Sequence, residues 1–244
     1  MKKTLERILS KAGVGSRTEA RKWIAGGRVR VNGKTVQDPE TWVDAERDRV
    51  QLDGRPIREA RKRYLLLYKP KGYVTTRRDP AGRPTVYDLL RDVKEFVGTA
   101  GRLDLDTSGL LILTNDHDFA DFVTSPESHV EKTYLVKAAH VLSEEQLQML
   151  RAGVELDDGP TRPCELRRLR DSEKYTHFEM KITEGRNRQV RRMVEAAGSK
   201  VLKLVRTSIG AVEIADLAIG SWRELTAAEV AALRSGSRRK SRIQ

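Results

Sequence analysis

The chain has 244 residues and a formal net charge of +12, a length that fits one large domain or two modest ones. No apolar run approaches the roughly 20 residues of a membrane-spanning helix, and the N-terminus lacks the apolar core of a secretion signal, so we expect a cytoplasmic protein with no membrane partner. The single cysteine excludes an intrachain disulfide, and the four histidines lack the spacing of zinc ligands.

The first 60 residues are predicted to form two short helices followed by a small sheet. Apolar residues recur at helical spacing from Leu5 to Leu9. Residues 16–19 read Ser-Arg-Thr-Glu, a capping-box pattern that predicts the start of a second helix. The dipeptide Asn32-Gly33 between valines is a strong hairpin signal, and further short strands are expected before residue 53.

A buried strand is predicted at residues 64–68, and the sequence Lys-Pro-Lys-Gly ends it at 69–72. Residues 101–104 read Gly-Arg-Leu-Asp and lead through a small polar turn to a second apolar strand at 110–113. A carboxylate on a loop that a sheet holds rigid is a sensible place for a nucleophile or a general base. From the residues alone, Asp104 is more often a turn-capping or ion-paired acid.

The later part of the chain contains further strands and one strongly basic helix. Residues 184–193 read Glu-Gly-Arg-Asn-Arg-Gln-Val-Arg-Arg-Met and begin a helix that ends near Gly198. Strands outnumber helices without regular alternation, which predicts an α+β fold with a mixed, mostly antiparallel sheet. Further strands are expected at residues 131–136, 154–156, 178–182 and 201–206, and a helix start at 226–229.

The basic charge lies at the two ends of the chain. Residues 1–63 hold 17 basic and 9 acidic residues, and residues 234–244 hold 5 basic residues and no acid. The remaining residues have a net charge of −1. Because no amphipathic membrane anchor accompanies the basic ends, a nucleic acid is the expected polyanionic partner.

Three motifs in this order resemble those of the ribosomal RNA pseudouridine synthases of the RsuA/RluB/RluE/RluF family. They are Lys-Pro-x-Gly at 69–72, Gly-Arg-Leu-Asp at 101–104 and Gly-Arg-x-x-Gln-Val-Arg at 185–191. The first 60 residues resemble the RNA-binding module of ribosomal protein S-four. This resemblance implies an S-four-like domain at 1–60, a catalytic domain at 63–233 and a basic tail at 234–244, which we expect to be disordered.

The resemblance also implies the roles of several residues. Asp104 is the essential catalytic acid, acting either as a nucleophile or as a base. Arg191 is its partner, and Tyr134 is the active-site tyrosine. Leu204 is a candidate wall of the uracil pocket, with core packing as an equal alternative. Asp106 is interpreted as structural, and the family's chemistry needs no cofactor and no metal.

The expected partner is ribosomal RNA, either large-subunit rRNA or a pre-ribosomal particle, bound by a monomer. Small-subunit 16S rRNA is the alternative target. A non-catalytic ribosome-assembly factor is the rival function, while an RNA methyltransferase would need a Gly-rich loop that the sequence lacks. The side chains predicted to contact RNA are all basic: Arg17, Arg21, Lys22, Arg28, Arg30, Lys69, Lys71, Arg102, Arg186 and Arg188.

Overall fold

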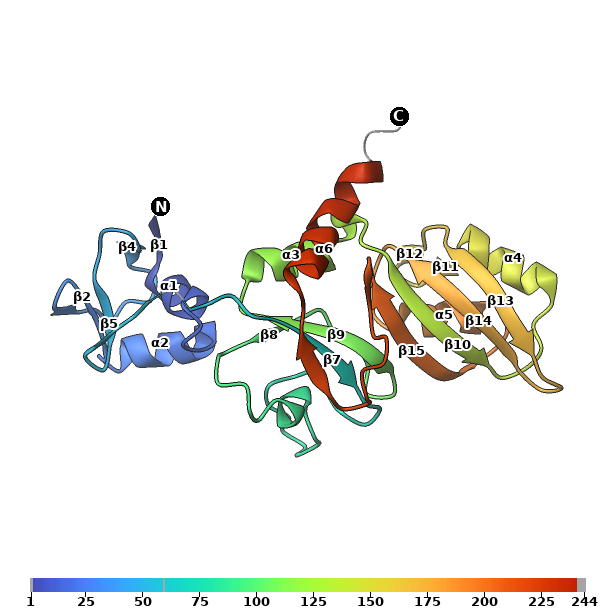
Figure 1. Cartoon of the computed structure of the whole chain (residues 1–244), viewed down its shortest axis with the longest axis horizontal. Coiled ribbons are helices and arrows are strands. Elements are labelled where there is room, and N and C mark those ends of the chain that lie inside the picture. The colour runs from blue at the N-terminus through green and yellow to red at the C-terminus, as the bar shows by residue number, and fades with distance from the viewer. Residues whose placement is uncertain (1, 59, 241–244) are drawn as a thin grey trace. The chain divides into compact units, whose positions relative to one another are not determined.

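A computed structural model describes residues 2–58 and 60–240 of the chain (Figure 1). The chain divides into two compact units, which are described separately here. The first consists of Met1–Arg63, Asp92–Gly98 and Thr114–His117, and the second of Tyr64–Arg91, Thr99–Leu113 and Asp118–Gln244.

The first unit contains two helices and short strands, as the sequence predicts. Ser16 and Glu19 form the predicted capping box at the start of the second helix. Asn32 and Gly33 have positive φ angles of 52° and 81°, as a tight hairpin turn requires. The elements are β1 (Lys2–Thr4), α1 (Leu5–Lys11), α2 (Arg17–Ala25), β2 (Val29–Val31), β3 (Lys34–Thr35), β4 (Trp42–Asp44), β5 (Val50–Leu52) and β6 (Arg55–Pro56).

The second unit is built on a nine-stranded sheet with the order β13-β14-β10-β15-β9-β7-β17, to which β8 and β16 are added at β9 and β15. The β15–β9 pair is parallel, while the pairs β13–β14, β14–β10, β10–β15 and β17–β7 are antiparallel. This arrangement confirms the predicted α+β fold with a mixed, mostly antiparallel sheet. Its strands are β7 (Tyr64–Lys69), β8 (Gly98–Ala100), β9 (Ser108–Thr114), β10 (Lys132–Ala138), β13 (Glu165–Asp171), β14 (Thr176–Ile182), β15 (Val201–Ile209), β16 (Val212–Glu213) and β17 (Trp222–Glu224). Strands β11 (Glu155–Leu156) and β12 (Gly159–Pro160) form a separate two-stranded sheet.

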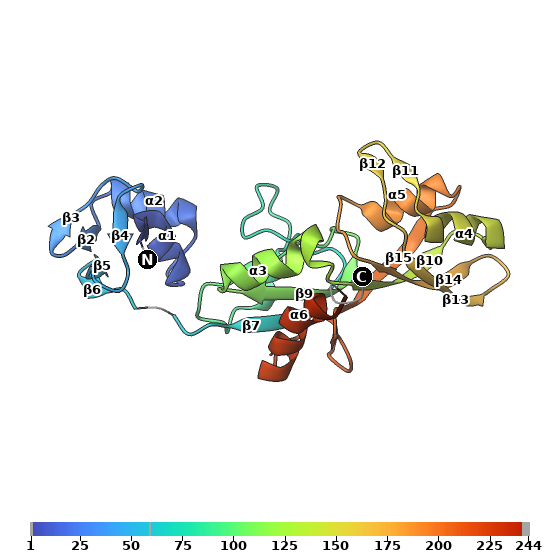
Figure 2. The same cartoon turned by 90° about the horizontal axis from the view of Figure 1, so that it is seen from above.

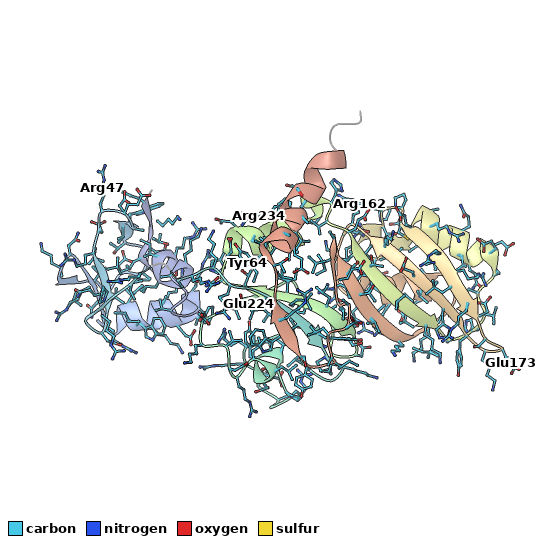
Figure 3. All side chains as sticks on the ribbon, in the orientation of Figure 1. Arg47, Tyr64, Arg162, Glu173, Glu224 and Arg234 are labelled. Atoms are coloured by element: carbon cyan, nitrogen blue, oxygen red, sulfur yellow. The ribbon has the colours of Figure 1, made fainter. Side chains whose placement is uncertain are left out.

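Helices cover this sheet in two groups. Helices α4 (Glu144–Ala152) and α5 (Gln189–Ala196) lie on one side of strands β10, β13, β14 and β15 (Figure 2). Their apolar residues and those of the strands form one core cluster. Helices α3 (His117–Thr124) and α6 (Ala227–Lys240) contribute to a second cluster with β7 and β9. There, Tyr64 packs edge-on against Phe119 and Arg234 lies over the same ring (Figure 3).

Helix α6 differs from the sequence prediction. A disordered tail is predicted from Arg234, but the helix continues to Lys240. The reason is that Thr226 and Glu229 cap the start of the helix and the buried Leu233 anchors it, so that each further turn adds hydrogen bonds at little cost. The last four residues of the tail lie outside the described residues.

None of the helices in the described part of the chain is both long and apolar enough to cross a membrane. Within the same residues, no group of three or more histidine, cysteine or acidic side chains is placed to hold a metal ion.

Candidate active site

The loop between β8 and β9, residues 101–107, carries the predicted catalytic acid. Thr107 is buried, and β9 follows at once and pairs with β15. Gly109 is opposite Arg206 in this pair and has φ +125°, and a Cβ atom there would lie 2.3 Å from the Arg206 carbonyl oxygen. Only glycine therefore allows the two strands to approach this closely, and the loop ends at a fixed point.

Lys69 fixes the backbone of this loop through hydrogen bonds from its side chain. Its ammonium donates hydrogen bonds to the carbonyl oxygens of Asp104 at 2.9 Å, Thr107 at 2.8 Å and Pro70 at 3.0 Å. The side chain is fully buried, so the predicted contact between Lys69 and RNA is wrong. A strand that ends in Lys-Pro places this lysine under the neighbouring loop and not at the surface. Burial lowers the pKa of Lys69 to about 8, although Asp104 and Asp106 favour its charged form.

The same segment makes two further contacts with the loop. The Gly72 amide donates to the Leu105 carbonyl at 2.7 Å, and the Thr75 hydroxyl donates to the Leu103 carbonyl at 2.7 Å. The first and second motifs are therefore one structure, in which the Lys-Pro-x-Gly segment fixes the backbone on which Asp104 stands.

Asp104 lies at a pocket where the two core clusters of the second unit meet. Its side chain is 31% exposed. Asp104 is the only carboxylate among the described residues that line the pocket, because Asp106 and Glu184 do not contribute to its wall. Tyr134 and Leu204 also line the pocket, and each is less than one-tenth exposed. Their predicted roles toward the uracil stay predictions.

The ion pairs around the loop differ from the prediction. Arg191 was expected to pair with Asp104, but its Nη2 lies 3.1 Å from Asp106 Oδ2 and also donates to the Asp106 carbonyl and the Thr107 hydroxyl. The nearest cation to Asp104 is Arg188, whose Nη1 is 3.8 Å from Asp104 Oδ2 and 3.4 Å from Asp106 Oδ1.

The ion pairs differ from the prediction because of where the two arginines lie. Arg191 is buried on α5 and contacts the loop at Asp106 and Thr107, whereas Arg188 precedes the helix and is exposed. Burial lowers the pKa of Arg191, and Asp106 opposes that effect. Asp106 is therefore structural in the sense predicted, since it compensates a buried guanidinium.

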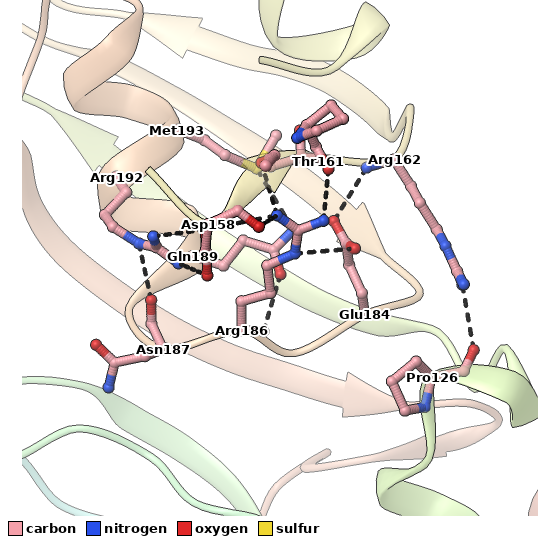
Figure 4. Close-up of polar contacts among 12 residues, drawn as sticks. Pro126, Asp158, Thr161, Arg162, Glu184, Arg186, Asn187, Gln189, Arg192 and Met193 are labelled. Atoms are coloured by element: carbon pink, nitrogen blue, oxygen red, sulfur yellow. Dashed lines mark hydrogen bonds and ion pairs between the residues drawn. The ribbon is translucent and has the colours of Figure 1, made fainter. Parts of the chain in front are cut away.

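The segment before α5 is held by a polar network that Figure 4 shows. Buried Gln189 donates to Glu184, and its amide oxygen accepts from the Arg186 backbone at 3.1 Å. The Arg186 guanidinium donates to the Gly159 and Pro160 carbonyls, and Arg192 forms an ion pair with Asp158 at 2.8 Å. Arg186 thus has a structural task, and its predicted RNA contact stays a prediction.

Two cations in the pocket were missed by the sequence analysis. Lys132 and Arg206 are 7% and 5% exposed, and both line the pocket. A signal was present for Lys132, because it precedes Tyr134 by two residues on a strand and therefore faces the same side. Arg206 lies within an apolar strand and gave no such signal.

The remaining side chains predicted to bind RNA are exposed. Lys71, Arg102 and Arg188 lie at the surface of the second unit. In the first unit, Arg21 forms ion pairs with Glu6 and Glu40, and Arg28 pairs with Asp53 at 2.6 Å. Of the cations predicted to bind RNA in this unit, Arg17, Lys22 and Arg30 have no ion-pair partner among the described residues. Their contact with RNA stays a prediction.

Comparison with known proteins identifies both parts of the chain. The RNA pseudouridylate synthase family matches residues 63–196, and the S4 domain family matches residues 4–50. The chain is 41% identical to an uncharacterized RNA pseudouridine synthase of Aquifex aeolicus over 96% of this chain and 94% of that protein. It is 39% identical to the ribosomal large subunit pseudouridine synthase B of Bacillus subtilis over 95% of each chain.

A solved structure described as a pseudouridylate synthase has the same fold. It superposes with a TM-score of 0.67 at 33% sequence identity and covers 94% of this chain and 99% of its own. With the pocket, its single carboxylate and the three motifs at one site, the chain belongs to the RNA pseudouridylate synthase family and is a pseudouridine synthase, an isomerase, with an N-terminal S4 domain.

Proposed function

We propose that this enzyme converts a specific uridine of large-subunit ribosomal RNA into pseudouridine, with Asp104 as the catalytic residue. The observation that supports this assignment most directly is that Asp104 is the only carboxylate among the described residues lining the pocket. Asp106, two residues later, is engaged by the buried Arg191. Asp104 is therefore the acid of the loop that is available for the reaction, and Asp106 stabilises the loop.

The proposed reaction starts when the target uridine leaves its stack and its base enters the pocket. Asp104 then attacks the ribose or removes a proton from it, and the N1–C1′ bond breaks. The detached uracil turns, and C5 joins C1′. The Arg188 guanidinium, 3.8 Å from the carboxylate, places a positive charge beside Asp104.

Two apolar contacts would keep the base in place during this rotation. Tyr134 packs against it, and Leu204, on the neighbouring strand, supplies further apolar surface of the pocket. Holding the detached base near C1′ makes its return an intramolecular step, which favours rejoining over loss of the base to solvent.

The choice of RNA rests on the relatives and on charge. The Bacillus subtilis relative is named for the large ribosomal subunit. The basic N-terminal residues 1–63, with a net charge of +8, supply attraction to phosphate that the almost neutral catalytic part lacks. We also propose residues 1–60 as the RNA-binding domain, residues 63–233 as the catalytic domain and the basic tail as an auxiliary contact, with the enzyme acting as a cytoplasmic monomer.

The experiment that tests the target is a map of pseudouridine in ribosomal RNA from cells with and without this protein. Loss of one pseudouridine from 23S rRNA, restored by the wild-type protein and not by Asp104→Asn, is the expected result. Loss of a site in 16S rRNA instead would assign the enzyme to the small subunit. An unchanged map would contradict a ribosomal RNA target.

A further inference from the structure

We propose that Lys132 and Arg206 form a cationic site that binds the uracil while it is detached from the ribose and carries negative charge. The inference rests on the proposed function in one respect, because it needs a uridine in the pocket beside Asp104. It assigns a catalytic task to two residues that otherwise only reduce the stability of the protein, since buried charges without partners destabilise a fold.

The two cations point into the same pocket from neighbouring strands. Lys132 lies on β10 two residues before Tyr134, so both side chains are on one face of the strand. Arg206 lies on β15 directly opposite Tyr134 in the strand register. Both residues line the pocket together with Asp104 and Leu204, the residues proposed to contact the ribose and the base.

Neither cation is satisfied by the protein. Lys132 Nζ and Arg206 Nη2 are buried atoms for which the described residues supply no hydrogen-bond partner. Arg206 is oriented by one bond, from Nε to the Leu110 carbonyl at 2.8 Å, which leaves Nη2 directed elsewhere. Buried polar groups are nearly always hydrogen-bonded, so two such donors in one pocket indicate a ligand that accepts hydrogen bonds.

The electrostatics of the pocket favour an anionic ligand. Burial lowers the pKa of Lys132 to about 8, and the positive charge of Arg206 acts in the same direction. Two like charges are therefore held near each other in a site whose wall contains one carboxylate among the described residues. A ligand with delocalised negative charge would relieve this repulsion, whereas a neutral one would leave it in place.

The reaction generates such a ligand at this position. When the N1–C1′ bond breaks, its electron pair stays on N1, and the resulting uracil monoanion spreads its charge over N1 and the oxygens O2 and O4. As C5 joins C1′, an electron pair of the anion forms the new bond. If Asp104 has bonded to the ribose, that bond returns its pair to the carboxylate; if Asp104 has instead taken a proton from the ribose, it gives that proton back. C5 then loses its proton and N1 gains one, so the product has the atoms and the charge of the substrate.

The charge thus exists only between bond cleavage and rejoining. Donors that meet it at that stage stabilise the intermediate and the transition states beside it more than the bound uridine, and this difference accelerates the reaction.

The test uses the full-length protein and compares Lys132→Met with Lys132→Arg, and with Lys137→Met as the matched control. Lys137 is on the same strand but faces the Tyr175 ring, 3.8 Å from its centre, and does not line the pocket. The readout is the single-turnover rate at which the target nucleoside loses its N-glycosidic bond, in RNA with either uridine or 5-fluorouridine at that position. Fluorine stabilises the uracil anion by itself, so it reduces the need for an enzymatic cation.

We expect Lys132→Met to slow the reaction of uridine about 100-fold, the cost typical of losing one such donor, with unchanged RNA affinity. With 5-fluorouridine the same variant should lose about tenfold or less. Lys132→Arg, which keeps the positive charge, should lose less than Lys132→Met with uridine, while Lys137→Met stays near the wild-type rate with both bases. The thermal midpoint of Lys132→Met should equal or exceed that of the wild type, because methionine removes a buried charge at similar volume.

Three results would overturn the inference. One is a wild-type rate for Lys132→Met, and another is an equal loss with both bases. The third is a loss of RNA affinity or of thermal stability with no change in the single-turnover rate, which would make Lys132 a phosphate contact or a structural residue. A wild-type enzyme that modifies no large-subunit rRNA refutes only the proposed target, since the same comparison can be made on the RNA that it does modify.

Discussion

Asp104 and Asp106 stand two residues apart and both lie near Arg188, but the buried Arg191 forms its ion pair with Asp106. Asp104→Asn should abolish pseudouridine formation while RNA affinity and the thermal midpoint stay near wild type, because the amide keeps the shape of the side chain but cannot act as nucleophile or base. Asp106→Asn should keep substantial activity and lower the thermal midpoint, because Arg191 loses its counter-charge. Nucleoside analysis of treated rRNA measures the activity. Pseudouridine formation by Asp104→Asn at the wild-type level would refute the assignment of Asp104 as the catalytic residue.

Arg188 and Arg191 can be separated in the same way. Arg191→Met should lower both the turnover number and the thermal midpoint, since Asp106 and the base of the loop lose a buried partner. Arg188→Met should lower the turnover number by removing the cation nearest Asp104, with little effect on stability because this side chain is 45% exposed. Equal thermal midpoints for the two variants would contradict the structural task of Arg191.

The pKa of Lys132 makes a prediction about stability against pH. Its folded-state pKa of about 8 lies below the ordinary value of 10.5, so between these pH values the folded protein has released a proton that the unfolded chain retains. Raising the pH through this window therefore increases the free energy of unfolding, by at most about 1.4 kcal/mol per pH unit from this group.

Lys132→Met lacks this gain. Its stability relative to the wild type should therefore be greatest near pH 7 and should fall as the pH rises toward 10. Urea denaturation at a series of pH values measures the difference, and a flat profile for Lys132→Met relative to the wild type would contradict the lowered pKa of this lysine.

At this scale, the sequence located the pocket residues but misjudged several of the contacts. Asp104, Tyr134 and Leu204 line one pocket because Tyr134 and Leu204 lie on the paired strands β10 and β15 and Asp104 lies on the loop that leads into β9. Lys69 was expected at an RNA surface because a lysine beside proline and glycine looks exposed, and only the fold reveals that its ammonium lies under another loop. The same holds for Arg191, since helical spacing does not specify which of two nearby acids a side chain reaches.

The elements that position the site depend on one close approach between β9 and β15. Gly109→Ala should lower the free energy of unfolding by at least about 2 kcal/mol, because it adds backbone strain to a clash with Arg206. Gly82→Ala is the matched control, with φ +69° and open space around the new methyl group, and should cost about 1 kcal/mol. Chemical denaturation measures the free energy of unfolding of both variants. Equal losses would show that the close approach of β9 and β15 adds nothing to the cost of the Gly109 substitution.

Several local signals predicted their elements, but one strong signal was overlooked and one strand gave no signal. The capping box at Ser16 predicted α2, and the apolar run after Gly109 predicted β9. Helix α4 was missed although Ser143 and Gln146 form a capping box of the same kind. Strand β13 was missed because it lies at the sheet edge, where its mostly exposed charged residues give no apolar alternation.

In the whole molecule, the basic charge is concentrated in the N-terminal part, while the pocket that contains Asp104 belongs to the second unit. The basic N-terminal part contains exposed cations of two kinds, those paired with carboxylates and those without an ion-pair partner among the described residues. Cations that already have a protein partner must give it up before they bind phosphate, so the others should contribute most of the RNA affinity. This distinction could not be made from the sequence, which predicted all of them equally.

Replacing Arg17, Lys22 and Arg30 together by Gln should therefore weaken RNA binding and reduce the slope of log affinity against log salt by about two to three. The reason is that each phosphate contact releases condensed counterions, and three contacts would be lost. The double variant Arg21→Gln, Arg28→Gln is the comparison and should change the slope less, because its cations are already neutralised by Glu6, Glu40 and Asp53. Binding is measured over a range of salt concentrations in the Asp104→Asn background, so that no turnover disturbs it. A triple variant with the full wild-type slope would mean that the first unit does not anchor the RNA through these side chains.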